Sequence, residues 1–215
     1  MKKLDRHNAL PCLDKFIPGV NKWTDAPKDL VWEELEKMQR GLCAYCECRL
    51  NRKHIEHFKN RKLHIQETFN WNNLFGSCGD SSQKGGWNRC GIFKDSGAVN
   101  YQVNNLIKPD IDSPDDYLLF LTNGKVSPQA GLEGRALLKA TETIRVFNLN
   151  DDTKLFNSRR VALEIIQEQV DALYELFDEC DEKTWQDMLD AELNNIQGEE
   201  FETALRHAWN SNCLY

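Results

Sequence analysis

No stretch of this sequence approaches the roughly 18–20 consecutive apolar residues that a membrane-spanning helix needs. The first sixteen residues are charged, are interrupted by Pro11 and contain no apolar core of the kind found in secretory signals. These absences predict a soluble, cytoplasmic protein. In a reducing cytoplasm its eight cysteines are expected to be metal ligands or catalytic groups rather than disulfides.

Internal repeats and low-complexity linkers are absent as well, which argues against a solenoid or a tethered array. The 215 residues are 40% apolar and 10% aromatic, enough to bury a core, so the composition excludes a disordered chain. A chain of this length forms one domain or at most two.

Acidic residues are scarce in one part of the chain, and basic residues are scarce in another. The net charge of −7 would by itself disfavour nucleic-acid binding. Residues 49–62, however, contain six Lys and Arg and a single acid, Glu56. Residues 161–206 contain fourteen acids and only two bases, Lys183 and Arg206. The sequence therefore predicts a basic module joined to an acidic helical one.

The residue pattern divides the chain into four regions and predicts an α+β fold. Apolar residues at three- and four-residue spacing predict a helix late in 1–40, and an Asn123-Gly124 turn predicts a hairpin within 96–150. From 151 the spacing is helical, with Asn150 or Asp151 as the cap and further helices at about 184–193 and 199–209. The regions are a helical lead (1–40), a cysteine-bearing module (41–95), a short hairpin and connecting segment (96–150) and an acidic helical region (151–215).

Four cysteines have the spacing of a structural zinc site. Cys43 and Cys46 form a C-x2-C pair, and the glycine-rich segment between Cys78 and Cys90 can fold back to bring the second pair to the first. Four thiolates make a closed tetrahedral site with no open position, so this zinc would be structural. Redox exchange at the C-x2-C pair and ordinary buried thiols are the alternatives. The remaining cysteines are not expected to take part: Cys12, Cys48, Cys180 and Cys213.

An acid, a histidine and an asparagine lie between the two cysteine pairs. Phosphodiester hydrolysis needs a base for water and a divalent ion at the phosphate. On a predicted strand, His57 can act as the base, and Glu56 offers the hard oxygen that Mg²⁺ or Mn²⁺ prefers. The amide oxygen of Asn73, sixteen residues later, can accept a hydrogen bond from the imidazole and orient it.

Together these motifs resemble the HNH endonucleases. The pattern consists of C43-x2-C46, E56-H57, W71-x-N73-L74, C78 and C90-G91-x2-K94. Further matches over residues 20–165, in order and spacing, resemble the PtuB-type HNH nucleases of the Septu antiphage system and their retron-associated relatives. The resemblance implies a ββα-metal finger braced by a four-cysteine zinc, with Glu56 as the metal-binding acid, His57 as the general base and Asn73 as the middle asparagine.

One position departs from the HNH pattern. Many HNH enzymes have a second metal-binding histidine directly after the last cysteine, where this chain has Gly91. The missing ligand could be His54, which shares a strand face with Glu56, or Asp95, or Asn72, or else water and substrate oxygens.

Basic residues surround the candidate site and are expected to contact phosphates without choosing a sequence. For Lys94 the alternative is capping its own helix end. The resemblance implies that the finger presents its helix to the minor groove. The expected contacts are Arg49, Arg52, Lys53, Lys59, Arg61, Lys62 and Lys94.

The resemblance implies a nuclease effector, with DNA as the favoured substrate, that works with an ATPase (PtuA-like) subunit. A homodimer within that complex is a further expectation. A retron-associated nuclease cutting RNA such as tRNA is one alternative. A zinc-finger adaptor without catalysis is the other. The acidic helices are expected to dock a protein partner or pack on the protein's own body, and not to contact nucleic acid.

Overall fold

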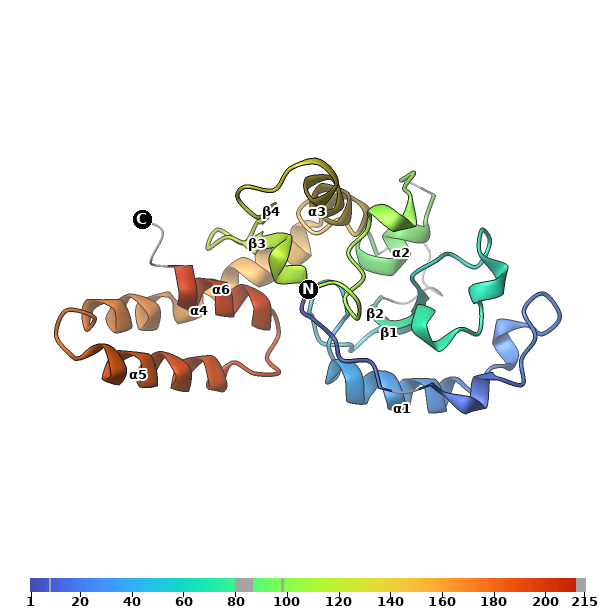
Figure 1. The fold of residues 1–215 in the computed structure, drawn as a ribbon, viewed down its shortest axis with the longest axis horizontal. Coiled ribbons are helices and arrows are strands. Elements are labelled where there is room, and N and C mark those ends of the chain that lie inside the picture. Colours follow the sequence, from blue (N-terminus) through green and yellow to red (C-terminus); the bar gives the residue numbers. More distant parts are fainter. Residues whose placement is uncertain (8, 80–86, 98, 212–215) are drawn as a thin grey trace.

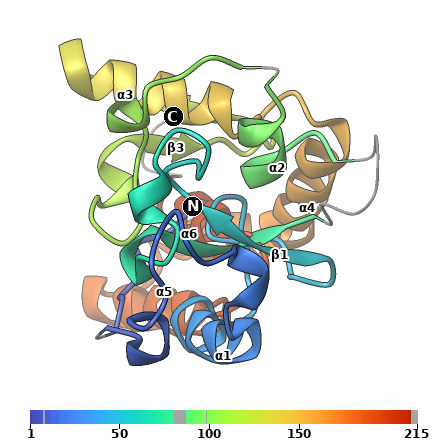
Figure 2. The same ribbon diagram turned by 90° about the vertical axis from the view of Figure 1, so that its right-hand side faces the viewer.

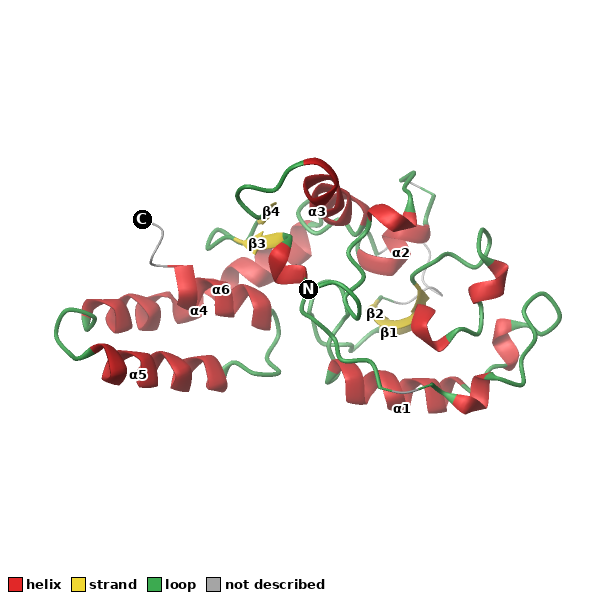
Figure 3. Ribbon diagram, viewed as in Figure 1, coloured by secondary structure: helices red, strands yellow, loops and turns green. Residues whose placement is uncertain are grey.

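The computed structural model describes residues 1–211 except 8, 80–86 and 98. The molecule is elongated, with α4, α5 and α6 at one end and the N-terminal helix with a two-stranded sheet at the other (Figures 1 and 3). The helices are α1 (Lys28–Gln39), α2 (Cys90–Asp95), α3 (Gly134–Val146), α4 (Thr153–Glu175), α5 (Glu182–Asn195) and α6 (Glu202–Ser211). The strands are β1 (Lys53–His57), β2 (Leu74–Cys78), β3 (Leu118–Phe120) and β4 (Val126–Pro128). The mixture agrees with the predicted α+β class.

The β1–β2 ribbon and α2 form the central unit. The two strands pair antiparallel, with His57 opposite Leu74 and Lys53 opposite Cys78. Every residue of β2 is buried, whereas β1 becomes buried only toward Glu56 and His57. Helix α2 packs on both strands. This arrangement turns one side of β1 and the start of α2 toward each other.

Helix α1 covers the free edge of β2. The buried amide of Gln39 accepts a hydrogen bond from the Gly76 N–H at 2.7 Å and donates one to the Gly76 carbonyl at 2.8 Å. These two bonds satisfy the Gly76 backbone at this edge, as a third strand would. The helix ends at Gln39, because Arg40 and Gly41 both adopt positive φ.

The N-terminal lead is fastened across this unit by Arg6. Its guanidinium pairs with Asp110 at 2.5 Å and donates to the carbonyls of Trp71 and Leu74, both at 2.9 Å. A buried guanidinium with a carboxylate and two carbonyl partners has most of its donors satisfied. The lead is thereby connected to the segment that enters β2.

Residues 96–150 contain more structure than the sequence pattern predicts. The hairpin is present as β3 and β4, with Gly124 at positive φ in its turn. The thirteen-residue helix α3 was not predicted. Only Ala140, Thr143 and Val146 of α3 are buried, and they form a single stripe along one face of the helix.

The acidic region folds into three helices, α4 to α6. Asp152 rather than Asn150 or Asp151 caps α4, accepting from the Leu155 N–H at 2.7 Å. The side chain of Asn150 instead forms two hydrogen bonds with Val126 of β4. It accepts one from the Val126 N–H and donates one to the Val126 carbonyl, both at 2.8 Å. Phe177, which continues the apolar spacing of α4 in the sequence, lies beyond the end of the helix and is 52% exposed.

Helix α6 belongs to the core, whereas α5 lies at the end of the molecule. Trp209 is 1% exposed, and α6 packs on α4 and β3. Directly after the Cys43–Cys46 pair, buried Glu47 accepts a hydrogen bond from the Thr203 N–H at 2.8 Å and is ion-paired with the Met1 amino group. Helix α6 is thus joined directly to the cysteine module. None of the helices in the described ranges is long and apolar enough to cross a bilayer.

Candidate functional site

Four thiols converge between the knuckle, the end of β2 and the start of α2. Cys43, Cys46, Cys78 and Cys90 are all buried, and their sulfur atoms all lie within 4.8 Å of one another. Cys48 lies outside this group and is half-buried. Cys213 and most of the glycine-rich segment before Cys90 fall outside the described residues.

Local backbone geometry places these sulfurs. The Cys43 N–H donates to the Cys48 carbonyl at 2.9 Å, and Glu47 takes positive φ between them, which closes a tight knuckle. Cys90 also has positive φ, and its N–H donates to the Phe147 carbonyl at 2.8 Å. Strain of this kind in residues other than glycine persists where surrounding contacts hold it, here at Glu47 between two cysteines and at Cys90 itself.

The sulfur spacing fits a tetrahedral zinc ion. The sulfurs of Cys46 and Cys78 are 3.6 Å apart, close to the edge of about 3.8 Å expected for a tetrahedron with Zn–S bonds of about 2.3 Å. Four thiols fill a tetrahedral ion completely and leave no position for substrate. The cluster is compatible with a structural zinc site, as the spacing of the cysteines predicts.

A separate cavity of about 620 Å³ lies beside β1 and the start of α2, and none of the four cysteines lines it. Glu56, His54 and His57 of β1 and Gly91 of α2 reach its wall. Its opposite wall comes from the N-terminal region, and its lining includes Trp23, Lys28, Trp32, Lys53, Arg61 and Asp95. The structure therefore gathers the predicted acid and histidines in one hollow.

Glu56 is a buried carboxylate held by two groups. Its side chain is 3% exposed, with one oxygen 2.8 Å from the Lys94 ammonium and the other 3.3 Å from His54 Nε2. Burial tends to raise the pKa of Glu56, but Lys94 and His54 outweigh it and hold the pKa below its ordinary value. The carboxylate is therefore charged at neutral pH and fixed in orientation.

Lys94 does not lie on the nucleic-acid surface, contrary to the sequence prediction. Its ammonium is fully buried beside Glu56, 2.6 Å from Asp95, and donates to the His57 carbonyl at 3.2 Å. Burial lowers the pKa of Lys94, and the two carboxylates raise it further than burial lowers it. A permanent cation beneath the site balances a negative charge that would otherwise be costly to bury.

Gly91 leaves room for the Glu56 side chain. A Cβ at position 91 would lie 2.3 Å from Glu56 Oε2 and 2.5 Å from Glu56 Cδ. The place where many HNH enzymes carry a metal-binding histidine is thus filled here by the carboxylate itself. Glu56 can occupy its position only because residue 91 has no side chain.

Gly91→Ala is therefore expected to displace Glu56 from Lys94 and His54. Breaking a buried ion pair costs about 3–5 kcal/mol, so the melting temperature should fall while the zinc content is kept, because the four thiols lie on the other side of α2. Gly91→His, which would restore the common HNH residue, should be more damaging still. A Gly91→His protein with parental melting temperature would show that Glu56 does not depend on this space.

His57 is held as a neutral base. It is 4% exposed, its Nε2 lies 2.9 Å from the Thr68 carbonyl, and the edge of the Trp23 ring packs on it with centroids 4.5 Å apart. The carbonyl can only accept, so Nε2 carries the proton and Nδ1 is left as the basic atom. Burial lowers the pKa of His57 to about 4, which keeps the imidazole unprotonated at neutral pH.

Asn73 does not contact the imidazole, and the predicted hydrogen bond between them is absent. Its amide oxygen accepts from the Lys59 N–H at 2.7 Å, and its nitrogen donates to the carbonyls of Lys59 and Glu67, at 3.1 and 3.0 Å. Asn73 therefore ties together the two ends of the segment 59–68. Because Thr68 ends that segment and orients His57, Asn73 acts on the base indirectly.

The predicted second metal ligands lie in different places. His54 Nε2 is 3.3 Å from Glu56 Oε2, near the separation of about 3.0 Å between adjacent ligands of an octahedral ion with bonds of about 2.1 Å. The other ring nitrogen of His54 is buried with no hydrogen-bond partner. Asp95 is paired with Lys94, and Asn72 lines a different hollow beside Phe69. Of the predicted ligands, only His54 lies within hydrogen-bond distance of Glu56, so these two side chains could share a divalent ion.

The basic segment is split by the fold. Lys53 and Arg61 line the cavity, and Lys62 is exposed on the same loop as Arg61. Lys59 is paired with Glu67 at 2.5 Å. Arg49 and Arg52 line a separate hollow of about 320 Å³ with Cys48, Trp87 and Arg89, and Arg49 lies 3.6 Å from Glu199 of the acidic region.

Sequence reasoning missed the N-terminal wall of the cavity. Trp23 and Trp32 were not assigned to the site, and neither was Lys28. They lie more than twenty residues before Glu56, and only the packing of α1 and its preceding turn brings them there. The sole local signal was a density of tryptophan in a short segment.

Comparison with known proteins connects the chain to one curated relative. It is 27% identical over 146 residues to the Septu protein PtuB of Bacillus thuringiensis, and the match covers 66% of this chain. The chain spans about half the length of that relative, 49% of which is matched. No family model matches the chain. The chain is a distant homologue of a Septu protein.

Proposed function

We propose that the protein is a metal-dependent HNH endonuclease that hydrolyses phosphodiester bonds, with DNA as the favoured substrate. The observation that carries this proposal is the cavity in which a neutral, oriented His57 lies next in the chain to the charged carboxylate of Glu56. The β1–β2–α2 arrangement, with four thiols behind it, supports a zinc-braced ββα finger. The homology to a Septu protein supports the same assignment.

In this mechanism each residue has one task. His57 accepts a proton from water at Nδ1, while the Thr68 carbonyl retains the proton on Nε2. Glu56 and His54 would hold Mg²⁺ or Mn²⁺, which when bound polarises the scissile phosphate. Lys94 keeps Glu56 ionised and immobile, and Lys53 and Arg61 attract the phosphate backbone.

We further propose that this nuclease is the effector of a Septu-type antiphage system, works with an ATPase subunit and pairs with a second copy within that complex. A weakly specific nuclease would damage its host unless it were restrained, so a gating partner is expected. A retron-associated enzyme that cuts RNA such as tRNA is the second candidate. The neighbouring genes separate the two, since a retron includes a reverse transcriptase.

The decisive experiment is incubation with double-stranded DNA, single-stranded DNA and tRNA, with Mg²⁺ or Mn²⁺ and with EDTA, alone and with the ATPase. Metal-dependent cutting of DNA supports the proposal. Cutting of tRNA alone supports the RNA candidate. Binding of nucleic acid without cutting under every condition would support a zinc-finger adaptor instead.

The docking surface for the ATPase is proposed to be α5 and the end of α4. Helix α6 is core, so deleting residues 180–215 would unfold the body; surface substitutions are the better test. Asp187 and Asp190 are exposed on α5. Changing both to lysine should weaken co-purification with the ATPase without altering the melting temperature, because exposed charges contribute little to stability. Asp29→Lys on α1 is the control, and an unchanged complex would place the interface elsewhere.

A further inference from the structure

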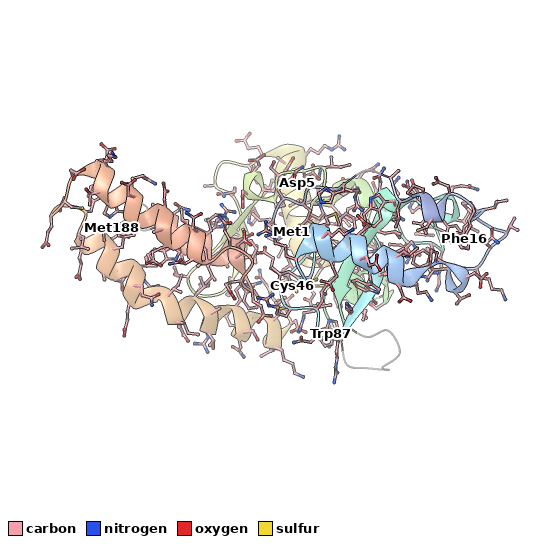
Figure 4. All side chains as sticks on the ribbon, turned by 90° about the horizontal axis from the view of Figure 1, so that it is seen from below. Met1, Asp5, Phe16, Cys46, Trp87 and Met188 are labelled. Atoms are coloured by element: carbon pink, nitrogen blue, oxygen red, sulfur yellow. The ribbon has the colours of Figure 1, made fainter. Side chains whose placement is uncertain are left out.

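Four aliphatic side chains are exposed at the end of the molecule opposite α5. They are Ile17 (59% exposed), Val20 (74%), Leu63 (79%) and Ile65 (50%), and together they are called the apolar tip. Figure 4 shows Phe16, next to the tip in sequence, at one end of the molecule and Met188 of α5 at the other. Clusters of exposed aliphatic residues of this kind mark a contact surface.

The tip is built from two loops that touch each other. A Cβ at Gly19 would lie 3.6 Å from Ile65 Cδ1, so the 17–20 turn lies directly on the 63–65 turn. Beneath them Phe16 stacks on Phe69, with ring centroids 5.2 Å apart. Figure 2 shows these two loops from the end of the molecule, in front of β1. The tip is therefore one surface standing on an ordered aromatic layer.

That layer leads directly to the candidate site. Trp23 lies 6.0 Å from Phe69 and 4.5 Å from the His57 ring, measured between centroids, and Arg61 lies over the Trp23 ring. The loop that carries Leu63 and Ile65 is the one whose end, Thr68, orients His57. A ligand that seats on the tip would therefore lie beside the cavity and contact the loop that sets the base.

The charge around the tip indicates which kind of partner binds there. Segments 15–23 and 59–66, which contain the tip, hold five Lys and Arg and no acid, in a protein of net charge −7. One of these cations, Lys59, is paired with Glu67 directly after the second segment. A protein partner seated on an apolar surface would not require this rim, whereas a phosphate backbone on either side of an inserted side chain would. Proteins that unstack base steps from the minor groove insert apolar side chains that are flanked by cations.

From this juxtaposition we infer that the apolar tip is a wedge that inserts between base pairs of a duplex bound at the cavity, opening a base step beside the bond to be cut. The inference rests on the proposed nuclease function and adds to it that the substrate is double-stranded and is distorted on binding. Leu63 and Val20, the most exposed of the four, are the inserting side chains.

The test uses the full chain in a His57→Ala background, so that the DNA is not cut, and a duplex with 2-aminopurine at successive positions. Binding should raise the fluorescence at one or two adjacent steps, because unstacked 2-aminopurine is brighter. Leu63→Asp and Val20→Asp should each abolish the rise and weaken duplex binding about tenfold, through loss of one buried aliphatic side chain. Ile165→Asp on α4, where the parent residue is also 69% exposed, should do neither.

The outcomes separate the wedge from the nuclease proposal. If tip variants with the parental His57 cut and unstack the duplex as the parent does, the wedge is wrong and the nuclease proposal stands. If the tip variants keep duplex binding and unstacking but lose the ATPase, the tip is a protein contact and the wedge is overturned. If the parent neither binds nor cuts nucleic acid, both fail.

Discussion

Replacing Cys43 with serine should remove zinc from the protein, unfold the 41–95 module and abolish nuclease activity together. Cys43 is 1% exposed, and its sulfur lies within 4.8 Å of three other thiols. A structural zinc contributes about 10–16 kcal/mol of apparent binding free energy to folding in small zinc modules, whereas an entire domain is stable by about 5–15 kcal/mol. The free energy lost with the zinc should therefore exceed the stability that the remaining contacts provide.

The measurements are zinc per chain by elemental analysis, thermal melting and cleavage. Cys12→Ser is the matched control, because Cys12 is half-buried and lies outside the thiol cluster. It should retain about one zinc per chain and the parental melting temperature. Cys48→Ser tests the neighbouring thiol and should also keep the metal. Full zinc content and unchanged melting in Cys43→Ser would show that these four cysteines are not a zinc cage.

The four-thiol cluster could be predicted from the sequence, because the spacing of the cysteines allows few arrangements. Two cysteines separated by two residues must share one turn, and a glycine-rich segment lets the second pair return to it. The charged Glu56 beside His57 was likewise readable, since adjacent residues on one strand keep a fixed relation whatever packs around them. These features depend on local geometry, which the sequence states directly.

The roles of Asn73 and Lys94 could not be predicted, because they depend on long-range packing. The sequence shows an asparagine at the right distance from a histidine, but not that its amide is consumed by Lys59 and Glu67. It shows a lysine in a basic region, but not that α2 turns it inward onto Glu56. In both cases a polar side chain meets a partner more than five residues away and becomes structural.

The N-terminal wall of the cavity was hidden for the same reason. Trp23 contacts His57 because α1 packs along the edge of β2 through Gln39. The residues around Trp23 do not predict that contact. Helix α3 was not predicted either, although its apolar residues follow the helical period as clearly as those of α6 do.

His57→Ala should abolish cleavage while the protein stays folded and keeps its zinc. Removing a positioned general base costs about 10²–10⁴-fold in rate, and no other described side chain in the cavity offers a neutral imidazole bound to a backbone carbonyl. The fold should survive because His57 belongs to β1 and contacts Trp23 and Thr68, not the thiol cluster. Loss of a packed ring and one hydrogen bond should cost about 1–3 kcal/mol of stability.

The matched control is His207→Ala. His207 is also a buried histidine with a backbone partner, accepting from the Phe120 N–H at 3.0 Å and packing on that ring, so its removal should cost a similar free energy of unfolding. It lies on α6, outside the cavity, and cleavage should continue at the parental rate. Asn73→Ala should fall between the two, since it loosens the segment that carries Thr68 but leaves the imidazole present. Parental cutting by His57→Ala, with zinc and folding intact, would exclude His57 as the base.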